Sequence, residues 1–329
     1  MIFQILNLFV WLNLASILNK SKMKKLILSI LLVGFTLISS GQNYVDLVKF
    51  THTQIPSSPF NKFENGDYKS IDETPSTSVS QSKISTSLPI TLGDSLVFLT
   101  GIDYELHRLK LNPVSTFSNL NIATLKLGFN KKHNRKLSGT YLALPKIASD
   151  FGHLKNSFQI GAIALWKYKL NPQTKLIFGN YINTELFGIL NVPILGVYHK
   201  SKNEKTEINI TFPITGYGDY KIHKNIRMGA DFLLIVRTFD LAQPAVNDSY
   251  VHTSSNEVAA YFQFDLFKES LIIKAKAVYS MFDYSVFKDN DKTPFGMFGW
   301  YPGDKRALPD YIISNALGFK ISAFYRFQL

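Results

Sequence analysis

The sequence predicts an all-β protein, a closed antiparallel transmembrane β-barrel. Three observations support this prediction: long segments in which apolar and polar residues alternate, turn residues between them, and an export signal near the start. Alternation with a two-residue period places successive side chains on opposite faces of a strand. Strands with one apolar and one polar face suit a closed barrel that has lipid outside and water inside.

Residues 23–41 have the layout of a secretory signal peptide. Met23, Lys24 and Lys25 precede an apolar run over 26–38, and small residues lead to an expected cleavage after Gly41. Residues 1–22 are interpreted as an upstream extension with Met23 as the true start, and a short transmembrane helix is the alternative. We therefore expect residues 1–41 to be extension plus signal and residues 42–329 to form a barrel in the cell outer membrane.

The composition excludes several classes of protein. The 329 residues contain no cysteine, which excludes disulfides, thiolate catalysis and thiolate metal sites. Residues 1–41 carry four lysines and no acidic residue, so the remainder keeps a formal charge of +8. The basic residues are scattered along the expected strands, and the sequence therefore predicts no nucleic-acid partner.

Alternation is clearest in five segments, which are 158–170, 226–239, 258–267, 271–282 and 317–329. In the last segment, Phe319 and Ile321 share one face with other apolar residues, while Lys320 and Ser322 lie on the opposite face. Ordinary globular strands are about half as long as this segment. A soluble two-sheet β protein is the alternative fold, and strand length together with the many outward aromatic residues weighs against it.

Turn lengths predict the number of strands, because outer-membrane barrels alternate short periplasmic turns with longer extracellular connections. Short polar turns lie at 93–94, 130–134, 171–174, 202–205 and 268–270. Longer connections lie at 54–80, 108–118, 147–156, 240–253 and 283–311. The alternation continues past residue 212 only if a short strand occupies about 216–223. This strand gives about fourteen strands in total, and twelve is the alternative if the segment is a loop.

Residues 42–329 resemble a known kind of protein. The segments TSLPITLGDSLVFLTGIDY, LNVPILGVYHKSKNEKTEINITFP and GFKISAFYRFQL are similar to those of an uncharacterised outer-membrane β-barrel family of Bacteroidota-type bacteria. The resemblance implies location and fold, with no assigned activity, catalytic residue or ligand. An outer-membrane barrel is expected to have membrane lipid and the barrel insertion machinery as partners, although the sequence ends on Leu329 where many such barrels end on an aromatic residue.

Inward faces of the expected strands carry more basic than acidic residues. A positive excess in a lumen attracts anions, so a pore lined by these residues would take small anionic solutes as partners. The alternative is that the bases pair with acids, for example Arg227 with Asp231, and fill the interior with ion pairs. The candidate lumen-lining residues are Lys126, Lys167, Arg227, Asp231, Arg237, Lys274, Lys276, Lys320 and Arg326.

The connection 283–311 differs from the others because aromatic residues alternate with glycine and proline in it. Long loops of this kind are usually functional or disordered, and the aromatic content argues against disorder. One hypothesis is that Phe295, Phe298, Trp300 and Tyr301 constrict the extracellular mouth or contact a ligand such as a sugar. The alternative is that the connection packs against neighbouring loops.

These observations favour a passive, porin-like channel with an electropositive lumen. The first alternative is a closed structural or adhesive barrel that binds a partner through its extracellular loops. An outer-membrane lipid hydrolase is less favoured, because no histidine pair has metal-ligand spacing and no serine is fixed beside a histidine. We therefore expect no enzymatic activity, no cofactor and no metal.

Overall fold

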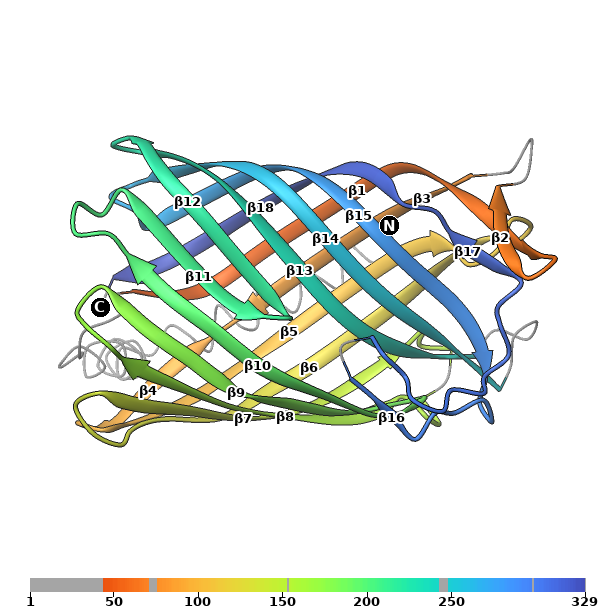
Figure 1. Ribbon diagram of the computed structural model, residues 1–329, viewed down its shortest axis with the longest axis horizontal. Coiled ribbons are helices and arrows are strands. Elements are labelled where there is room, and N and C mark those ends of the chain that lie inside the picture. Colours follow the sequence, from red (N-terminus) through yellow and green to blue (C-terminus); the bar gives the residue numbers. More distant parts are fainter. Residues whose placement is uncertain (1–43, 71–75, 153, 243–247, 298, 329) are drawn as a thin grey trace, which may run out of the picture. The chain divides into compact units, whose positions relative to one another are not determined.

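The computed structural model describes residues 44–70, 76–152, 154–242, 248–297 and 299–328, which form one closed antiparallel barrel (Figure 1). The extension and signal peptide predicted over residues 1–41 lie outside the described residues. In chain order the strands are β1 (Tyr44–Glu64), β2 (Asp67–Ser70), β3 (Ser76–Thr86), β4 (Leu88–Gly93), β5 (Leu96–Lys110), β6 (Phe117–Lys132), β7 (Leu137–Ser149), β8 (Phe158–Lys169), β9 (Thr174–Glu185), β10 (Gly188–Lys200), β11 (Thr206–Phe212), β12 (Thr215–His223), β13 (Ile226–Leu241), β14 (Ser249–Leu266), β15 (Leu271–Lys288), β16 (Phe295–Gly296), β17 (Tyr311–Ile313) and β18 (Ala316–Gln328).

The wall of the barrel consists of fourteen strands. β3 and β4 are separated by Ser87 and both pair with β5, so they form one wall strand. The short β2 and β17 pair with β1, and the short β16 pairs with β10, so none of the three is counted as a wall strand. β1 closes the barrel, because Phe50 pairs with Ala323 of β18 on one side and with Ile84 of β3 on the other. The fourteen-strand prediction is confirmed, including the short strand expected at 216–223, and the twelve-strand alternative is wrong.

The outer surface of the barrel is apolar. Along β18, Leu317, Phe319 and Ile321 are 70%, 51% and 49% exposed, whereas Lys320 and Ser322 on the opposite face are buried. β14 repeats this pattern, with Val258, Phe262 and their outward neighbours exposed and every second residue buried. Apolar side chains outside and polar ones inside reverse the arrangement of a soluble protein. The chain is therefore an outer-membrane type of β-barrel rather than a soluble two-sheet protein.

Several strands extend further at the extracellular end than the sequence predicts. The segment 54–80 was expected to be a loop, but β1 continues to Glu64 and turns through Asn65 and Gly66, both at positive φ, into β2. The extra length is stabilised by pairing with β3 on one side and β17 on the other. β15 likewise continues to Lys288, inside the connection predicted at 283–311.

Among the described residues, none forms a helix of the length and hydrophobicity that a membrane crossing requires.

A packed apolar core fills the extracellular half of the lumen. Phe60, Phe239 and Tyr284 are fully buried there, although the outward residues of the same strands face lipid. The core also contains Ile55, Val79, Leu109, Leu111, Leu120, Ile122, Ala148, Leu241, Val251, Ala259, Val278, Phe282 and Ile313. Because side chains packed at the density of a protein interior leave no path for water, we expect the described residues to seal this end of the barrel.

The wall is incomplete between β10 and β13. β11 and β12 have seven and nine residues, and Figure 1 shows them ending about halfway along the barrel. β10 pairs with β11 from Leu195 onward, and β13 pairs with β12 up to Leu233. The hairpin turns at Pro213, which has no N–H to donate to a sheet and so ends the ladder. Beyond this turn, β10 and β13 face each other across a notch with no wall strand of the described chain between them.

The extracellular half of β13 leans into the barrel beside this notch. Asp240 pairs with Ser149 of β7, and the Gln159 side-chain amide of β8 donates to the backbone carbonyl of Thr238 over 3.1 Å. The Thr238 hydroxyl donates to the carboxylate of Glu185 over 2.6 Å. The outer face of β13 therefore packs against the inner ends of β7, β8 and β9.

Candidate functional site

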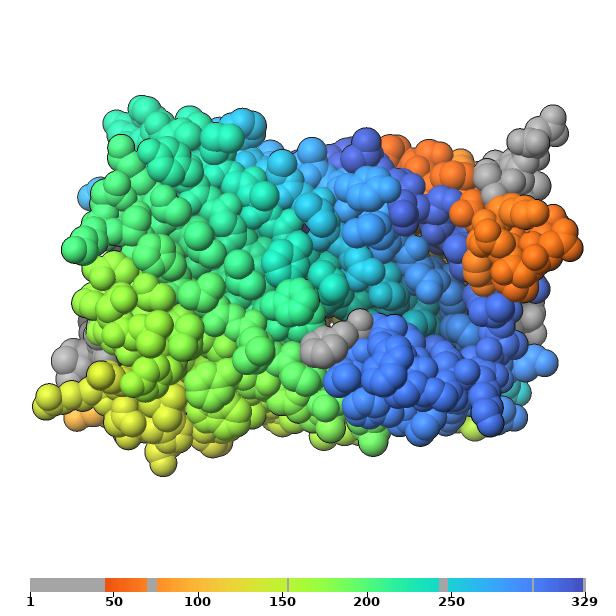
Figure 2. All heavy atoms as spheres, in the orientation of Figure 1, coloured from red at the N-terminus to blue at the C-terminus, as the bar shows by residue number. Residues whose placement is uncertain are grey.

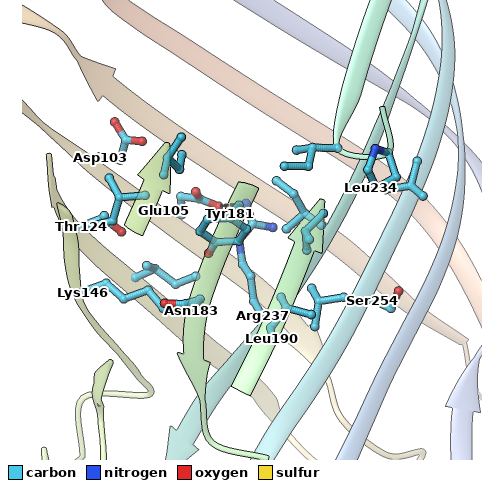
Figure 3. Close-up of a pocket in the computed structure, with 18 of the residues that line it drawn as sticks. Asp103, Glu105, Thr124, Lys146, Tyr181, Asn183, Leu190, Leu234, Arg237 and Ser254 are labelled. Carbon is cyan, nitrogen blue, oxygen red and sulfur yellow. Dashed lines mark ion pairs between the residues drawn. The ribbon is translucent and has the colours of Figure 1, made fainter. Parts of the chain in front are cut away.

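A cavity of about 530 Å³ lies inside the barrel at the level of the notch (Figure 3). Its apolar lining residues are Ile122, Leu142, Leu144, Ile163, Leu190, Val192, Pro213, Ile214, Leu234, Ile235 and Val236. Its polar and charged lining residues are Lys83, Asp103, Glu105, Thr124, Lys126, Lys146, Tyr181, Asn183, Arg237, Ser254 and Asn256. We call this cavity the wall pocket, because its lining includes residues of the incomplete wall.

The apolar side of the wall pocket coincides with the rim of the notch. Leu190 and Val192 come from the part of β10 that lacks a β11 partner, and Ile214 is the tip of the short hairpin. Leu234 and Val236 come from the part of β13 beyond its pairing with β12. The backbone N–H of Leu234 donates to the Ile214 carbonyl over 2.7 Å, which fixes the hairpin tip to β13.

The charged side of the wall pocket is centred on Glu105, on the inner face of β5. The Glu105 carboxylate lies 2.7 Å from Lys83 Nζ and 2.7 Å from a guanidinium nitrogen of Arg237. Beside it, the Lys126 ammonium lies 2.6 Å from Asp103. Buried charges need partners at such distances because they have lost their hydration. In Figure 3, Asp103 and Glu105 lie across the pocket from Leu234.

Cations outnumber carboxylates in the lining of the wall pocket. Lys83, Lys126, Lys146 and Arg237 line it, against Asp103 and Glu105. Lys146 Nζ forms a 2.8 Å ion pair with the carboxylate of Glu185, which is not among the lining residues. The site thus combines an apolar side at the wall with a side whose fixed charges are predominantly positive.

The predicted lumen residues divide between the pocket and the rest of the barrel interior. Lys126 and Arg237 line the wall pocket, while Lys167 lies on an inner face with no carboxylate within 4.0 Å in the described part of the chain. The remaining candidates, apart from Lys274, form ion pairs inside the barrel. These pairs are Arg227–Asp219 at 2.6 Å, Arg326–Asp46 at 2.6 Å, Lys276–Asp231 and Lys320–Glu257.

The predicted pairing of Arg227 with Asp231 is not the one formed. Residues four apart on one strand are separated by about 13 Å, whereas cross-strand neighbours lie about 5 Å apart. Arg227 therefore binds Asp219 of the neighbouring β12, and Asp231 binds Lys276.

Sequence reasoning missed several inward acids, namely Glu105, Glu185, Asp219 and Glu257. The two-residue period of the strands could have found them. Glu105 is two residues after the inward Asp103, and Glu257 is two residues before the buried Ala259, so each shares an inner face with that residue. These acids reduce the positive excess that the sequence predicts. Like Lys167, Lys274 and Lys49 have no carboxylate within 4.0 Å among the described residues: Lys274 lies 4.2 Å from the ring centre of Tyr261, and Lys49 lies 4.7 Å from that of Phe324.

The aromatic connection after β15 lies against the notch. β16 within it pairs in parallel with β10, with Phe295 opposite Ile189, and the Thr293 N–H donates to the Phe187 carbonyl over 2.9 Å. Figure 2 shows this connection in blue, packed against the green strands of the wall. Of the predicted constriction residues, Phe295 and Tyr301 are half-buried here, Trp300 is exposed, and Phe298 lies outside the described residues.

Arg306 fastens the connection to the barrel. Its guanidinium lies 4.4 Å from the ring centre of Phe287, 5.1 Å from Tyr301 and 5.5 Å from Phe187, and it forms a 2.8 Å ion pair with Asp304. Burial opposes ionisation of Asp304, but the hydrogen bonds from Arg306 outweigh it and lower the pKa of this carboxyl. The Tyr301 hydroxyl lies 2.9 Å from His252 Nε2 on β14, a second point of attachment.

No protein-family model and no curated protein matches the chain, so the resemblance to a Bacteroidota-type family stays a prediction. Among solved structures, the chain is similar to an outer-membrane channel from Pseudomonas putida F1, with 8% identity, a TM-score of 0.43, and coverage of 88% of this chain and 100% of the other. It is similar to a Pseudomonas aeruginosa FadL homologue, with 11% identity, a TM-score of 0.44, and coverage of 86% and 90%. It is also similar to the translocator domain of the Neisseria meningitidis autotransporter NalP, with 9% identity, a TM-score of 0.34, and coverage of 93% and 95%. At these identities and scores, none of the three assigns the chain an activity or a ligand.

Proposed function

We propose that the protein is a passive outer-membrane channel, which receives small molecules in the wall pocket and releases them toward the periplasm. The observation that supports this proposal is a pocket of about 530 Å³ inside the barrel, at a depth where the extracellular core ends. This volume falls within the range of pockets that hold small ligands. The proposal includes no catalytic step.

We further propose that the lumen favours anions. The cations of the pocket outnumber its carboxylates. A lumen with fixed positive charge raises the local concentration of anions and lowers that of cations.

Both proposals are tested by chemical labelling of single cysteines, since the natural chain contains none. Thr124 lines the wall pocket, and its neighbour Leu125 points to the lipid with 39% exposure. Thr124→Cys is expected to react in refolded vesicles with an anionic methanethiosulfonate faster than with a cationic one of similar size. Leu125→Cys is the matched lipid-facing control and is expected to react with neither. Asp94→Cys, in an exposed periplasmic turn, is expected to react with both.

Two results would contradict these proposals separately. An unreactive Thr124→Cys beside a reactive Asp94→Cys would mean that small solutes do not reach the pocket, and the channel would be excluded. Equal rates with the two reagents, after correction for Asp94→Cys, would exclude the electropositive lumen and leave the channel standing.

A further inference from the structure

We propose that Lys49 and Lys274 form a binding site for a divalent oxyanion such as phosphate on the inner wall of the barrel. The two lysines come from β1 and β15, which pair with the two edges of β18, and neither lysine lines the wall pocket. The inference therefore goes beyond the proposed function, and it does not depend on passage of a solute through that pocket.

The first step of the inference is that both lysines point into the barrel without a partner of opposite charge. Lys49 pairs in the sheet with the buried Phe324, and Lys274 pairs with the buried Gln263 and Ser322. In the described part of the chain, neither ammonium group forms an ion pair or a hydrogen bond. Both residues are half-buried and have lost part of their hydration. A cation in this position is stabilised by an anion that reaches it.

The second step is the aromatic surface that holds the two ammonium groups. The ring centre of Phe324 lies 4.7 Å from Lys49 Nζ and 5.9 Å from Lys274 Nζ. Lys274 Nζ also lies 4.2 Å from the ring centre of Tyr261 and 5.0 Å from that of Tyr217. The faces of aromatic rings attract cations but carry no net charge. The rings therefore position both ammonium groups and leave their positive charges uncompensated.

The third step is that nearby carboxylates are already paired. Three acidic side chains attract Lys49 or Lys274 electrostatically, and each has a base of its own. The pairs are Asp46–Arg326 and Asp219–Arg227, both at 2.6 Å, and Asp231–Lys276. Lys49 and Lys274 thus keep two positive charges that repel each other. An anion bound beside both lysines replaces this repulsion with two attractions.

These features define the chemistry of the ligand. A lysine ammonium is a compact point charge that forms charge-assisted hydrogen bonds with oxyanions. The hydroxyls of Tyr261 and Tyr217 donate to Asp219 and Glu207 over 3.0 and 2.7 Å, so the lysines are the groups that recognise the ligand. Recognition by two point charges selects for charge, and the two negative charges of phosphate at mildly alkaline pH match them.

Differential acetylation measures occupancy of the site in mature protein refolded in detergent. N-hydroxysuccinimidyl acetate modifies lysines, and mass spectrometry of the peptides gives the rate at each position. Phosphate is expected to slow acetylation of Lys49 and Lys274 with one common half-saturation concentration, by about tenfold at about ten times the dissociation constant. Acetate at equal ionic strength is expected to have little effect. Lys167, which is also inward and without a carboxylate among the described residues, is the internal control and should be unaffected.

Substitutions test whether the two lysines act together. Lys274→Gln is expected to abolish the protection of Lys49 by phosphate, and Lys49→Gln is expected to abolish that of Lys274. Lys167→Gln removes the same charge elsewhere on the inner face and should leave both protections unchanged. Titration calorimetry with phosphate is the second readout, with one binding event expected in the natural chain and in Lys167→Gln, and none in Lys49→Gln. Folding of each variant is checked by the shift in gel mobility on heating.

The outcomes separate this site from the proposed channel. Absence of both protection and binding heat in the natural chain would overturn the site, even if Thr124→Cys still reacts faster with the anionic reagent. Equal protection of Lys167 would mean general screening and would also overturn the site. Equal protection by acetate would overturn the preference for a divalent anion. Protection of Lys49 and Lys274 beside an unreactive Thr124→Cys would support the site and exclude the channel.

Discussion

Glu105 holds together the charged side of the wall pocket. Its carboxylate contacts Lys83 and Arg237 at 2.7 Å each, and one of its oxygens lies 3.6 Å from His107 Nε2, a ring whose other nitrogen lies 3.0 Å from the Tyr284 hydroxyl. The residue therefore connects the charged pocket to the apolar core above it. Removal of its charge would leave Lys83 and Arg237 without their shared partner.

Glu105→Gln is expected to lower the free energy of unfolding by about 3 kcal/mol, the typical cost of breaking a buried ion pair from one side. Urea unfolding in lipid vesicles measures this change. Lys62→Gln removes one member of the exposed pair with Glu64 and is the control, expected to leave the unfolding midpoint unchanged. A Glu105→Gln midpoint equal to that of the natural chain would contradict the assigned role.

Asp304 makes the attachment of the aromatic connection sensitive to acid. Its folded pKa is lowered from 3.8, because the hydrogen bonds from Arg306 outweigh the effect of burial. Its contribution is therefore present above pH 3.8 and is lost as the pH falls through the lower folded pKa. In a Trp166→Phe variant of the mature protein, emission from Trp300 should stay constant from neutral pH to about pH 5 and shift only in stronger acid. A shift near neutral pH, or one that persists in Asp304→Asn, would contradict this.

The sequence alone locates charged side chains better than it identifies their partners. Alternation placed Arg227, Lys276 and Arg326 inside the barrel, where the structure has them. Their partners depend on which residues of neighbouring strands lie opposite each other. That register follows from closing the whole sheet, so the predicted pair of Arg227 with Asp231 was wrong although both residues face inward.

At the scale of elements, the β11–β12 hairpin determines where the wall opens. The regular order of short and long connections predicted a short strand near residue 216, and β12 confirms it. The notch was not predicted. A short strand leaves a gap in the wall only where the neighbouring strands are longer, and β13 continues for eight residues past its pairing with β12. The loop predicted at 54–80 was wrong for a related reason, since pairing with β3 and β17 extends β1 to Glu64.

The connection after β15 is expected to detach when Arg306 is replaced. Arg306→Gln removes the ion pair with Asp304 and the contacts with the rings of Phe287 and Tyr301. Chymotrypsin should therefore cut the connection faster, at a rate measured by gel electrophoresis. Lys305→Gln removes the same charge from the neighbouring exposed residue and should change the rate little. Equal cleavage of the two variants would mean that Arg306 does not anchor the connection.

At the scale of the whole molecule, the barrel combines a sealed extracellular half with a pocket beside an incomplete wall. The two-residue period and the turn lengths suffice to predict a closed fourteen-strand barrel, because lipid outside and polar groups inside impose alternation on every strand. They do not show whether the lumen is open. Inward positions mix glycines such as Gly161 and Gly318 with bulky residues such as Phe282, and only the folded barrel shows that Phe282 and its neighbours pack together.

Single-channel conductance of the refolded mature protein in a planar bilayer tests the sealed extracellular half most directly. Folding is verified beforehand by heat-dependent gel mobility. The packed core around Phe60 and Tyr284 predicts no steady conductance steps at moderate voltage, because ions have no continuous water path along the barrel axis. Steady, long-lived steps from the natural chain would show that the lumen is open from end to end, and would contradict the seal.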